Sequence, residues 1–236
     1  MSATATRNPA IDSSPTLEFK NATRQQTSLL APFERVCLRW LAREMPLWVK
    51  PDHLTLLGFT AMLSAGVCYA LSKWWAPSLL IVNLFIALNW FGDSLDGTLA
   101  RARNKQRPRY GFYVDHIIDS FGAVFLLCGL GLSGYMSWTV AFVALVAFLL
   151  LSIELYLASY TIGTFKLSHY KFSPTELRVL LVVGNVRAFL RPTAHVFGGE
   201  YRLFDVGAVI AVVLMSVILI ISVVRNTITL YRAERV

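Results

Sequence analysis

Long apolar stretches occupy most of this 236-residue sequence and constrain its fold more than any other feature. Hydrophobic residues make up 56% of the chain and charged residues only 15%, a balance too apolar for an ordinary soluble domain. A helix needs about 20 apolar residues to cross a bilayer. Six stretches approach that length, at residues 53–74, 77–101, 111–132, 137–160, 174–190 and 204–230. The sequence therefore predicts an all-α integral membrane protein with six transmembrane helices.

The segments before the first span predict two further regions. Residues 1–31 are mostly polar and lack the apolar core of a signal peptide, which predicts a disordered cytoplasmic tail. In residues 32–50, Arg35, Arg39 and Arg43 recur every four residues among apolar side chains. This spacing predicts an amphipathic helix at the membrane interface, although a surface helix of a soluble domain would share it. We expect residues 51–236 to form a six-helix membrane domain.

The net charge of +8 is divided unevenly between the predicted loops. The basic residues of one side are Arg101, Arg103, Lys105, Arg107, Arg109, Lys166, Lys171, Arg232 and Arg235. The loops of the other side contain only Lys73, Arg191 and Arg202. Because basic loops tend to remain in the cytoplasm, we expect both termini on the cytoplasmic side. The basic residues are scattered between apolar spans, so nucleic acid is not an expected partner.

Four aspartates lie at the facing ends of the second and third spans. Asp93 and Asp96 are three residues apart, and Asp115 and Asp119 are four apart, so each pair lies on one helix face. Four carboxylates at one point of a membrane would repel one another unless a cation lay between them. Carboxylate oxygens suit Mg²⁺, Mn²⁺ or Ca²⁺, and Mg²⁺ in proteins often also binds substrate phosphates. The sequence predicts a metalloenzyme whose carboxylates converge at the cytoplasmic face.

Small residues follow the first aspartate pair. Gly97 and Ala100 leave one helix face bare, so that a flat ligand could approach the backbone, although close helix packing would also favour small residues. Arg101, one residue further, is placed to reach a diphosphate, or it simply ends the span as an interfacial arginine.

The full pattern is DxxDGxxAR, ending at Arg101, followed by GxxxDxxxD from Gly111 to Asp119. It resembles the signature of the CDP-alcohol phosphotransferases, also called CDP-alcohol phosphatidyltransferases. The plan of six spans behind an interfacial helix is similar to that family as well. Nine residues separate Arg101 from Gly111, one more than the usual pattern has, and the extra residue falls in the basic connection.

The resemblance implies a reaction and a set of residue roles. In this family an acceptor hydroxyl attacks the β-phosphorus of a CDP-linked alcohol, and CMP is released. The aspartates implied to hold two divalent ions, Mg²⁺ or Mn²⁺, are Asp93, Asp96, Asp115 and Asp119. Asp119 is also implied as the general base towards the acceptor hydroxyl. The residues implied to accommodate the cytidine and its phosphates are Gly97, Ala100, Arg101 and Gly111.

Two donor types remain open within the family. Either CDP-diacylglycerol donates a phosphatidyl group to a small alcohol, or CDP-choline or CDP-ethanolamine donates to a diglyceride. The compact chain favours CDP-diacylglycerol. The string DHIIDS around His116 resembles choline and ethanolamine phosphotransferases and tilts the choice the other way.

The resemblance also implies a homodimer embedded among membrane lipids. The small residues that would permit close helix contact are Gly122, Ala123, Gly129 and Gly131. Two other classes use acidic membrane sites, namely intramembrane prenyltransferases and divalent-cation transporters. The prenyltransferases lack the pattern of Gly97, Ala100 and Arg101, and a transporter would hold its acids near the midplane.

Several other polar residues have open roles. Asp52 or Thr55 is expected to cap the first span in preference to contacting substrate. Glu176 and Arg178 interrupt the predicted fifth span, where they would line an acceptor site, form an ion pair or cap the helix. Glu154 lies inside the fourth span without an obvious partner in the sequence.

Overall fold

The computed structural model describes residues 31–162 and 174–234, which form seven helices and one β-hairpin. The predicted tail, residues 1–31, lies outside the described residues except for Ala31, which begins the first helix. The elements are α1 (Ala31–Glu44), α2 (Pro51–Leu71), α3 (Ser78–Ala102), α4 (Pro108–Ser133), α5 (Trp138–Thr161), α6 (Pro174–Leu190), β1 (Thr193–Val196), β2 (Gly199–Arg202) and α7 (Leu203–Ala233).

Proline and glycine set several helix ends. Pro51 and Pro108 occupy the first turns of α2 and α4, and Pro174 begins α6. Proline suits this position because its missing N–H would have no partner within the helix. Gly134 follows α4 with a φ of 81°, the left-handed conformation in which glycine commonly ends a helix.

Five helices are long and apolar enough to cross a membrane, namely α2, α3, α4, α5 and α7. The predicted fifth span coincides with α6, which has 17 residues and would extend roughly 26 Å at the usual helical rise. That length is slightly below the roughly 30 Å of a bilayer core. The described residues are thus mainly helical and apolar, as predicted, with five candidate spans in place of six.

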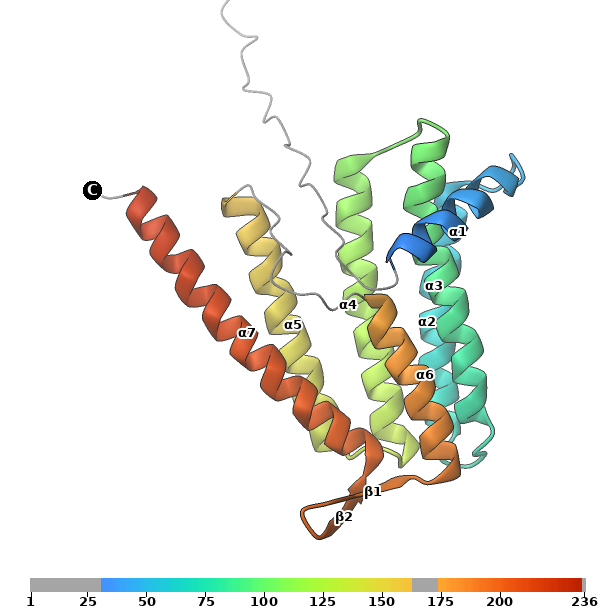
Figure 1. The fold of residues 1–236 in the computed structure, drawn as a ribbon, viewed down its shortest axis with the longest axis vertical. Helices are drawn as coiled ribbons and strands as arrows, with labels where there is room; N and C mark the ends of the chain where they lie inside the picture. The colour runs from blue at the N-terminus through green and yellow to red at the C-terminus, as the bar shows by residue number, and fades with distance from the viewer. Residues whose placement is uncertain (1–30, 163–173, 235–236) are drawn as a thin grey trace, which may run out of the picture.

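The helices form a bundle in which α2 contacts both α3 and α4 (Figure 1). α6 packs against α3, α5 packs against α4, and α7 packs against α5. α1 crosses α3 near the connection between α3 and α4 (Figure 1). This end of the bundle is here called the α1 end, and the halves of α3 and α4 nearer to it carry all four aspartates of the predicted site. The hairpin between α6 and α7 lies at the opposite end.

Glycines bring α2 and α4 into close contact. A Cβ atom added at Gly129 would overlap the backbone of Gly66, and one added at Gly66 would overlap the backbone of Phe125. A Cβ at Gly131 would lie 2.5 Å from the ring of Trp138. Gly129 and Gly131, which the sequence offered for contact between two chains, therefore serve packing within one chain.

Two clusters of buried apolar residues hold the bundle together. One contains Tyr69 and Phe204, and it is crossed by hydrogen bonds from the Tyr69 hydroxyl to Asn185 (2.8 Å) and from Asn185 to Asn83 (2.8 Å). The other lies beneath α1 and joins it to α2 and α3; its residues are Leu38, Ala42, Val49, Leu54, Leu95 and Leu99. The second cluster fixes α1 beside the predicted site.

The β-hairpin departs from the all-α prediction. Thr193 pairs with Arg202 and Val196 with Gly199, which leaves Phe197 and Gly198 as a two-residue turn. Both turn residues have positive φ, 49° and 80°, as a type I′ turn requires. Strands of four residues are too short to show an alternating pattern in a sequence dominated by apolar spans.

Candidate active site

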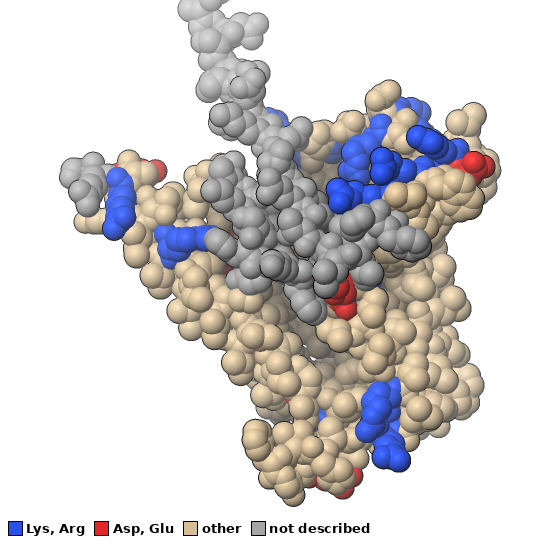
Figure 2. All heavy atoms as spheres, in the orientation of Figure 1, with Lys and Arg blue, Asp and Glu red and all other residues tan. Residues whose placement is uncertain are grey.

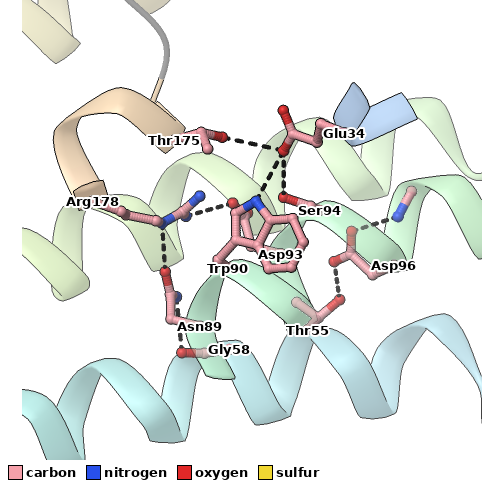
Figure 3. Close-up of polar contacts among 11 residues, drawn as sticks. Glu34, Thr55, Gly58, Asn89, Trp90, Asp93, Ser94, Asp96, Thr175 and Arg178 are labelled. Carbon is pink, nitrogen blue, oxygen red and sulfur yellow. Dashed lines mark hydrogen bonds and ion pairs between the residues drawn. The ribbon is translucent and has the colours of Figure 1, made fainter. Parts of the chain in front are cut away.

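Asp93 lies in an ordered set of polar contacts that joins three helices (Figure 3). Its Oδ2 accepts a hydrogen bond from Nη2 of Arg178 on α6 at 2.6 Å. Nε of Arg178 donates to Oδ1 of Asn89 at 3.0 Å, and Nδ2 of Asn89 donates to the carbonyl of Gly58 on α2 at 3.0 Å. Arg178 therefore pairs with an aspartate of the predicted metal site, which is the ion-pair alternative considered from the sequence.

Asp96 faces α2 and is buried, with a relative exposure of 9%. Its Oδ2 accepts a hydrogen bond from the Thr55 hydroxyl at 2.6 Å, and its Oδ1 accepts one from the backbone N–H of Gly97. Asp96 also experiences the negative charges of Asp93 and Asp115. Thr55 was expected to cap α2, and the structure instead gives it a contact with the predicted metal ligand.

Asp115 and Asp119 lie on α4, the first half-buried and the second exposed. α3 and α4 pack mainly on α2 and not on each other. As the side chains stand, the described part of the chain gathers no three Asp, Glu, His or Cys residues closely enough to ligate one ion. The two aspartate pairs share one end of the bundle, but their side chains are not gathered around one point. Their convergence on a metal ion therefore stays a prediction.

The predicted nucleotide-binding residues differ in their surroundings. Arg101 is exposed, and its Nη2 donates to the Thr98 hydroxyl at 3.1 Å. A Cβ atom at Gly97 would make only ordinary contact, 3.5 Å from Arg101, and one at Gly111 would meet nothing within 4 Å. Ala100 is half-buried. Since packing within the chain does not require glycine at position 97 or 111, these positions are free to meet other demands.

Basic side chains gather over α1 and the α3–α4 connection (Figure 2). Arg103 donates to the carbonyls of Met45 and Pro46 at 2.9 Å and also to that of Val49, so it ties the α1–α2 linker to the end of α3. Arg107 pairs with Asp52 and lies over the ring of Tyr110 at 4.1 Å. Asp52, a second candidate cap, is therefore an ion-pair partner of the α3–α4 connection.

An apolar groove of about 330 Å³ runs between α2 and α4 from this basic end. Asp52 and Tyr110 lie at its polar end, and its remaining lining is Thr55, Leu56, Phe59, Val114, Ile117, Ile118 and Phe121. Thr55 connects the groove to Asp96, so a molecule with an apolar tail in the groove would lie beside the acidic site.

His116 lies between the two aspartates of α4 in sequence but packs against aromatic neighbours. Its Nδ1 is 2.6 Å from the carbonyl oxygen of Phe112, and its ring meets that of Tyr156 edge-on at 4.7 Å.

Glu154, for which the sequence indicated no partner, accepts hydrogen bonds from Ser222 (2.8 Å) and Asn226 (2.6 Å) on α7. It serves helix packing away from the site.

The comparison with protein families decides the identity of this arrangement. A sequence model of the CDP-alcohol phosphatidyltransferase family matches residues 48–230, a range that includes all four aspartates. The chain belongs to this family. The resemblance predicted from the motif is thereby confirmed. Family membership leaves the prenyltransferase and transporter hypotheses without support.

The names of individual relatives refer to different head groups, inositol phosphate in one and choline in another. The archaetidylinositol phosphate synthase of Pyrococcus horikoshii is 31% identical over 100 residues, covering 42% of this chain and 50% of the relative. Cholinephosphotransferase 1 of Homo sapiens is 28% identical over 181 residues, covering 71% of this chain and 42% of the relative. The chain thus spans half or less of the length of these relatives.

A solved structure has the same fold. The crystal structure of Mycobacterium tuberculosis phosphatidylinositol phosphate synthase, with CDP-DAG bound, superposes with a TM-score of 0.53 at 20% identity. The match covers 85% of this chain and 94% of that chain. Together with the five apolar helices, the family match identifies an integral membrane protein related to enzymes of phospholipid synthesis.

The sequence did not single out several residues that build the site. Asn89 was not named from the sequence, and neither was Glu34 of α1, whose Oε1 accepts hydrogen bonds from Trp90 and Ser94 beside Asp93. Thr55 was given a different role. Asn89 is a polar residue one turn before Asp93 in an apolar span, a spacing that could have indicated it. Glu34 carries no such signal, because an acidic residue in the first turn of a helix is ordinary.

Proposed function

We propose that this chain transfers a phosphatidyl group from CDP-diacylglycerol to the hydroxyl of a small water-soluble alcohol and releases CMP. The observation that carries the proposal is the family match over residues 48–230, combined with the position of the family motif beside Thr55 and Arg178 at one end of the bundle. The groove between α2 and α4 supports a donor with an apolar tail, because its apolar lining leads to Thr55.

The donor set fits divalent ions by its chemistry. Asp96 is buried and already lies in the field of Asp93 and Asp115, so added positive charge would relieve the repulsion. The residues that would hold Mg²⁺ or Mn²⁺, two ions in all, are Asp93, Asp96, Asp115 and Asp119. Arg178 already contacts Oδ2 of Asp93, so a divalent ion would share this carboxylate with the arginine. Bound metal would neutralise the diphosphate and stabilise charge on the departing CMP.

The side chains then divide the work of the transfer. The acceptor oxygen forms a bond to the β-phosphorus while the bond from that phosphorus to the CMP oxygen breaks. Asp119 is the proposed base and takes the proton of the acceptor hydroxyl. The proposed nucleotide-binding residues are Gly97, Ala100, Arg101 and Gly111. The open space at Gly111 supports this assignment, because an approaching nucleotide gives a reason for glycine that packing does not.

The placement in the membrane is part of the same proposal. α6 would be the sixth transmembrane helix, slightly shorter than the bilayer core. α1 would lie in the membrane interface, with the exposed side chains of Arg35, Arg39 and Arg43 directed towards lipid headgroups. The basic residues around the α3–α4 connection support a cytoplasmic position for the α1 end and its active site. A homodimer within the lipid bilayer is the proposed assembly.

The alternative donor is CDP-choline or CDP-ethanolamine, with a diglyceride as acceptor. The match to Homo sapiens cholinephosphotransferase 1 extends over 71% of the chain, which favours this alternative. The DHIIDS string around His116 agrees with it. The proposed aspartate site would serve either donor, because both donors contain the same diphosphate.

Identification of the product lipid separates the two donors. Purified protein in proteoliposomes would receive CDP-diacylglycerol with a mixture of small alcohols, or CDP-choline and CDP-ethanolamine with diacylglycerol, each with Mg²⁺. Mass spectrometry of the lipids should show a new phosphatidyl-alcohol only from CDP-diacylglycerol. A choline or ethanolamine lipid formed from the other pair would replace our donor with the alternative, and Asp119→Asn protein serves as the inactive control.

A further inference from the structure

Glu34 of α1 lies at the centre of a cluster of hydrogen bonds beside the candidate active site (Figure 3). Its side chain is buried, with a relative exposure of 9%. One carboxylate oxygen, Oε1, accepts hydrogen bonds from Nε1 of Trp90 (2.9 Å), the Thr175 hydroxyl (3.1 Å) and the Ser94 hydroxyl (3.4 Å). The three donors come from two helices, α3 and α6.

These donors surround the ion pair between α3 and α6. Ser94 is the neighbour of Asp93 in the chain, and Trp90 lies one turn before it on α3. Thr175 lies one turn before Arg178 on α6. Glu34 therefore fixes the two helix segments that carry Asp93 and Arg178, from the side of α1.

Attachment of α1 does not by itself account for this carboxylate. Leu38, Ala42 and Val49 already bury the inner side of the α1 segment against α2 and α3. Burial of a charged group is costly, and an apolar residue of similar volume would pack there without this cost. An acidic residue also suits the first turn of a helix, but that benefit needs no burial and no contact with α6. The contacts instead serve the relative position of α3 and α6.

We infer that Glu34 is a positioning residue of the active site, which holds Asp93 and Arg178 in register through Trp90, Ser94 and Thr175. The inference rests on the proposed function, because the register matters for the binding of a divalent ion at Asp93. It makes α1 a structural part of the active site in addition to a segment at the membrane surface. Loss of the carboxylate removes this link between α3 and α6 and leaves the contacts of Arg178 with Asp93 and Asn89 to hold the two helices at this level.

The test compares Glu34→Gln and Glu34→Ala with Glu44→Gln, an exposed carboxylate on the same helix. Mn²⁺ binding to protein in nanodiscs, measured by electron paramagnetic resonance, should weaken by about tenfold or more in the alanine variant, because loss of a group that orients a metal ligand typically costs about 10–100-fold in affinity. Glu34→Asp should recover part of the affinity. Glu44→Gln should bind as the wild type does.

Hydrogen exchange gives a second readout that does not depend on catalysis or metal. Peptides covering residues 174–180 should exchange faster in Glu34→Ala than in the wild type, while peptides from α5 should not change. Folded Glu34→Ala protein with unchanged exchange in α6 and unchanged Mn²⁺ affinity would overturn the inference. If the alanine variant does not fold, Glu34→Met decides by the same two measurements, because methionine has a similar volume but lacks the oxygen that accepts the three hydrogen bonds. Wild type that neither binds Mn²⁺ nor releases CMP would contradict the proposed function, while the exchange result would still decide the role of Glu34.

Discussion

Arg178 on α6 donates from Nη2 to Oδ2 of Asp93 on α3 at 2.6 Å, across 85 positions of the sequence. The arginine side chain is 15% exposed and the aspartate side chain 38%. The pair joins the fifth predicted span, the least apolar of the six, to the helix that carries the first aspartate pair. Arg178, one of the charged residues that interrupt α6, therefore contacts the proposed metal site.

Replacement of Arg178 tests the importance of this pair. Arg178→Gln removes the positive partner of Asp93 and one hydrogen bond to Asn89, and we expect a loss of about 1–3 kcal/mol in the free energy of unfolding. Turnover should fall by at least about tenfold, because Asp93 loses its fixed orientation. Thermal unfolding in detergent and CMP release would measure both effects. Arg187→Gln, an exposed arginine on the same helix, is the matched control, and an equal loss there would refute the specific role of Arg178.

Alanine substitutions of Gly111 and Gly92 distinguish a glycine needed for ligand binding from a glycine needed for helix packing. Gly111→Ala adds a Cβ atom that meets nothing within 4 Å, so stability should be unchanged or rise by up to about 1 kcal/mol through helix propensity. Affinity for the CDP-linked donor should nevertheless fall, because the proposed nucleotide approaches the backbone here. A donor titration of CMP release would show the change as a higher KM.

Gly92→Ala should behave in the opposite way. The added Cβ would lie 2.5 Å from the carbonyl oxygen of Leu54 and 2.8 Å from the backbone nitrogen of Gly58. Separation of α2 from α3 should cost about 1–3 kcal/mol, as overpacking usually does. A Gly111→Ala variant with an unchanged donor KM would remove Gly111 from the nucleotide site.

Thr55 provides a test of the contact between α2 and Asp96. Thr55→Val keeps the shape of the side chain but removes the donor to a buried carboxylate, which should destabilise the fold by about 1–3 kcal/mol. Thr55→Ser keeps the hydroxyl and should remain close to the wild type. Equal stability and equal turnover of the valine and serine variants would show that the hydrogen bond has no consequence for the site.

Asp119 is the residue whose proposed role is most specific. Asp119→Asn should reduce turnover to the background level, because an amide cannot accept the proton of the acceptor hydroxyl. Binding of a CDP-linked donor should persist within a few-fold, and isothermal titration with protein in nanodiscs would measure it. Substantial turnover by the variant would exclude Asp119 as the base.

The sequence was most informative where apolar length and motif spacing determine the outcome. The predicted span at residues 174–190 coincides with α6, and the last predicted span, 204–230, differs from Leu203–Ala233 by up to three residues. Apolar stretches bounded by polar or charged residues mark both helices, so local composition is sufficient to find them. The DxxDGxxAR pattern likewise identified the family before any fold was known.

Contacts between distant segments were not predictable in the same way. Glu34 and Thr175 are 141 positions apart, and Thr55 and Asp96 are 41 apart, so the local sequence around each residue does not indicate its partner. The glycines of α4 show a related problem. Gly129 looked suited to contact between two chains, yet it meets Gly66 of the same chain, because small residues mark close helix contacts without naming the partner.

The most direct test of the account is CMP release by purified protein in proteoliposomes containing CDP-diacylglycerol, supplied with small alcohols and titrated with Mg²⁺. We predict release that requires Mg²⁺, stops with chelator, returns when the ion is restored, and is absent in Asp96→Asn protein that remains folded. Release that continues unchanged in chelator, or that Asp96→Asn retains in full, would contradict a metal-dependent transfer at these aspartates.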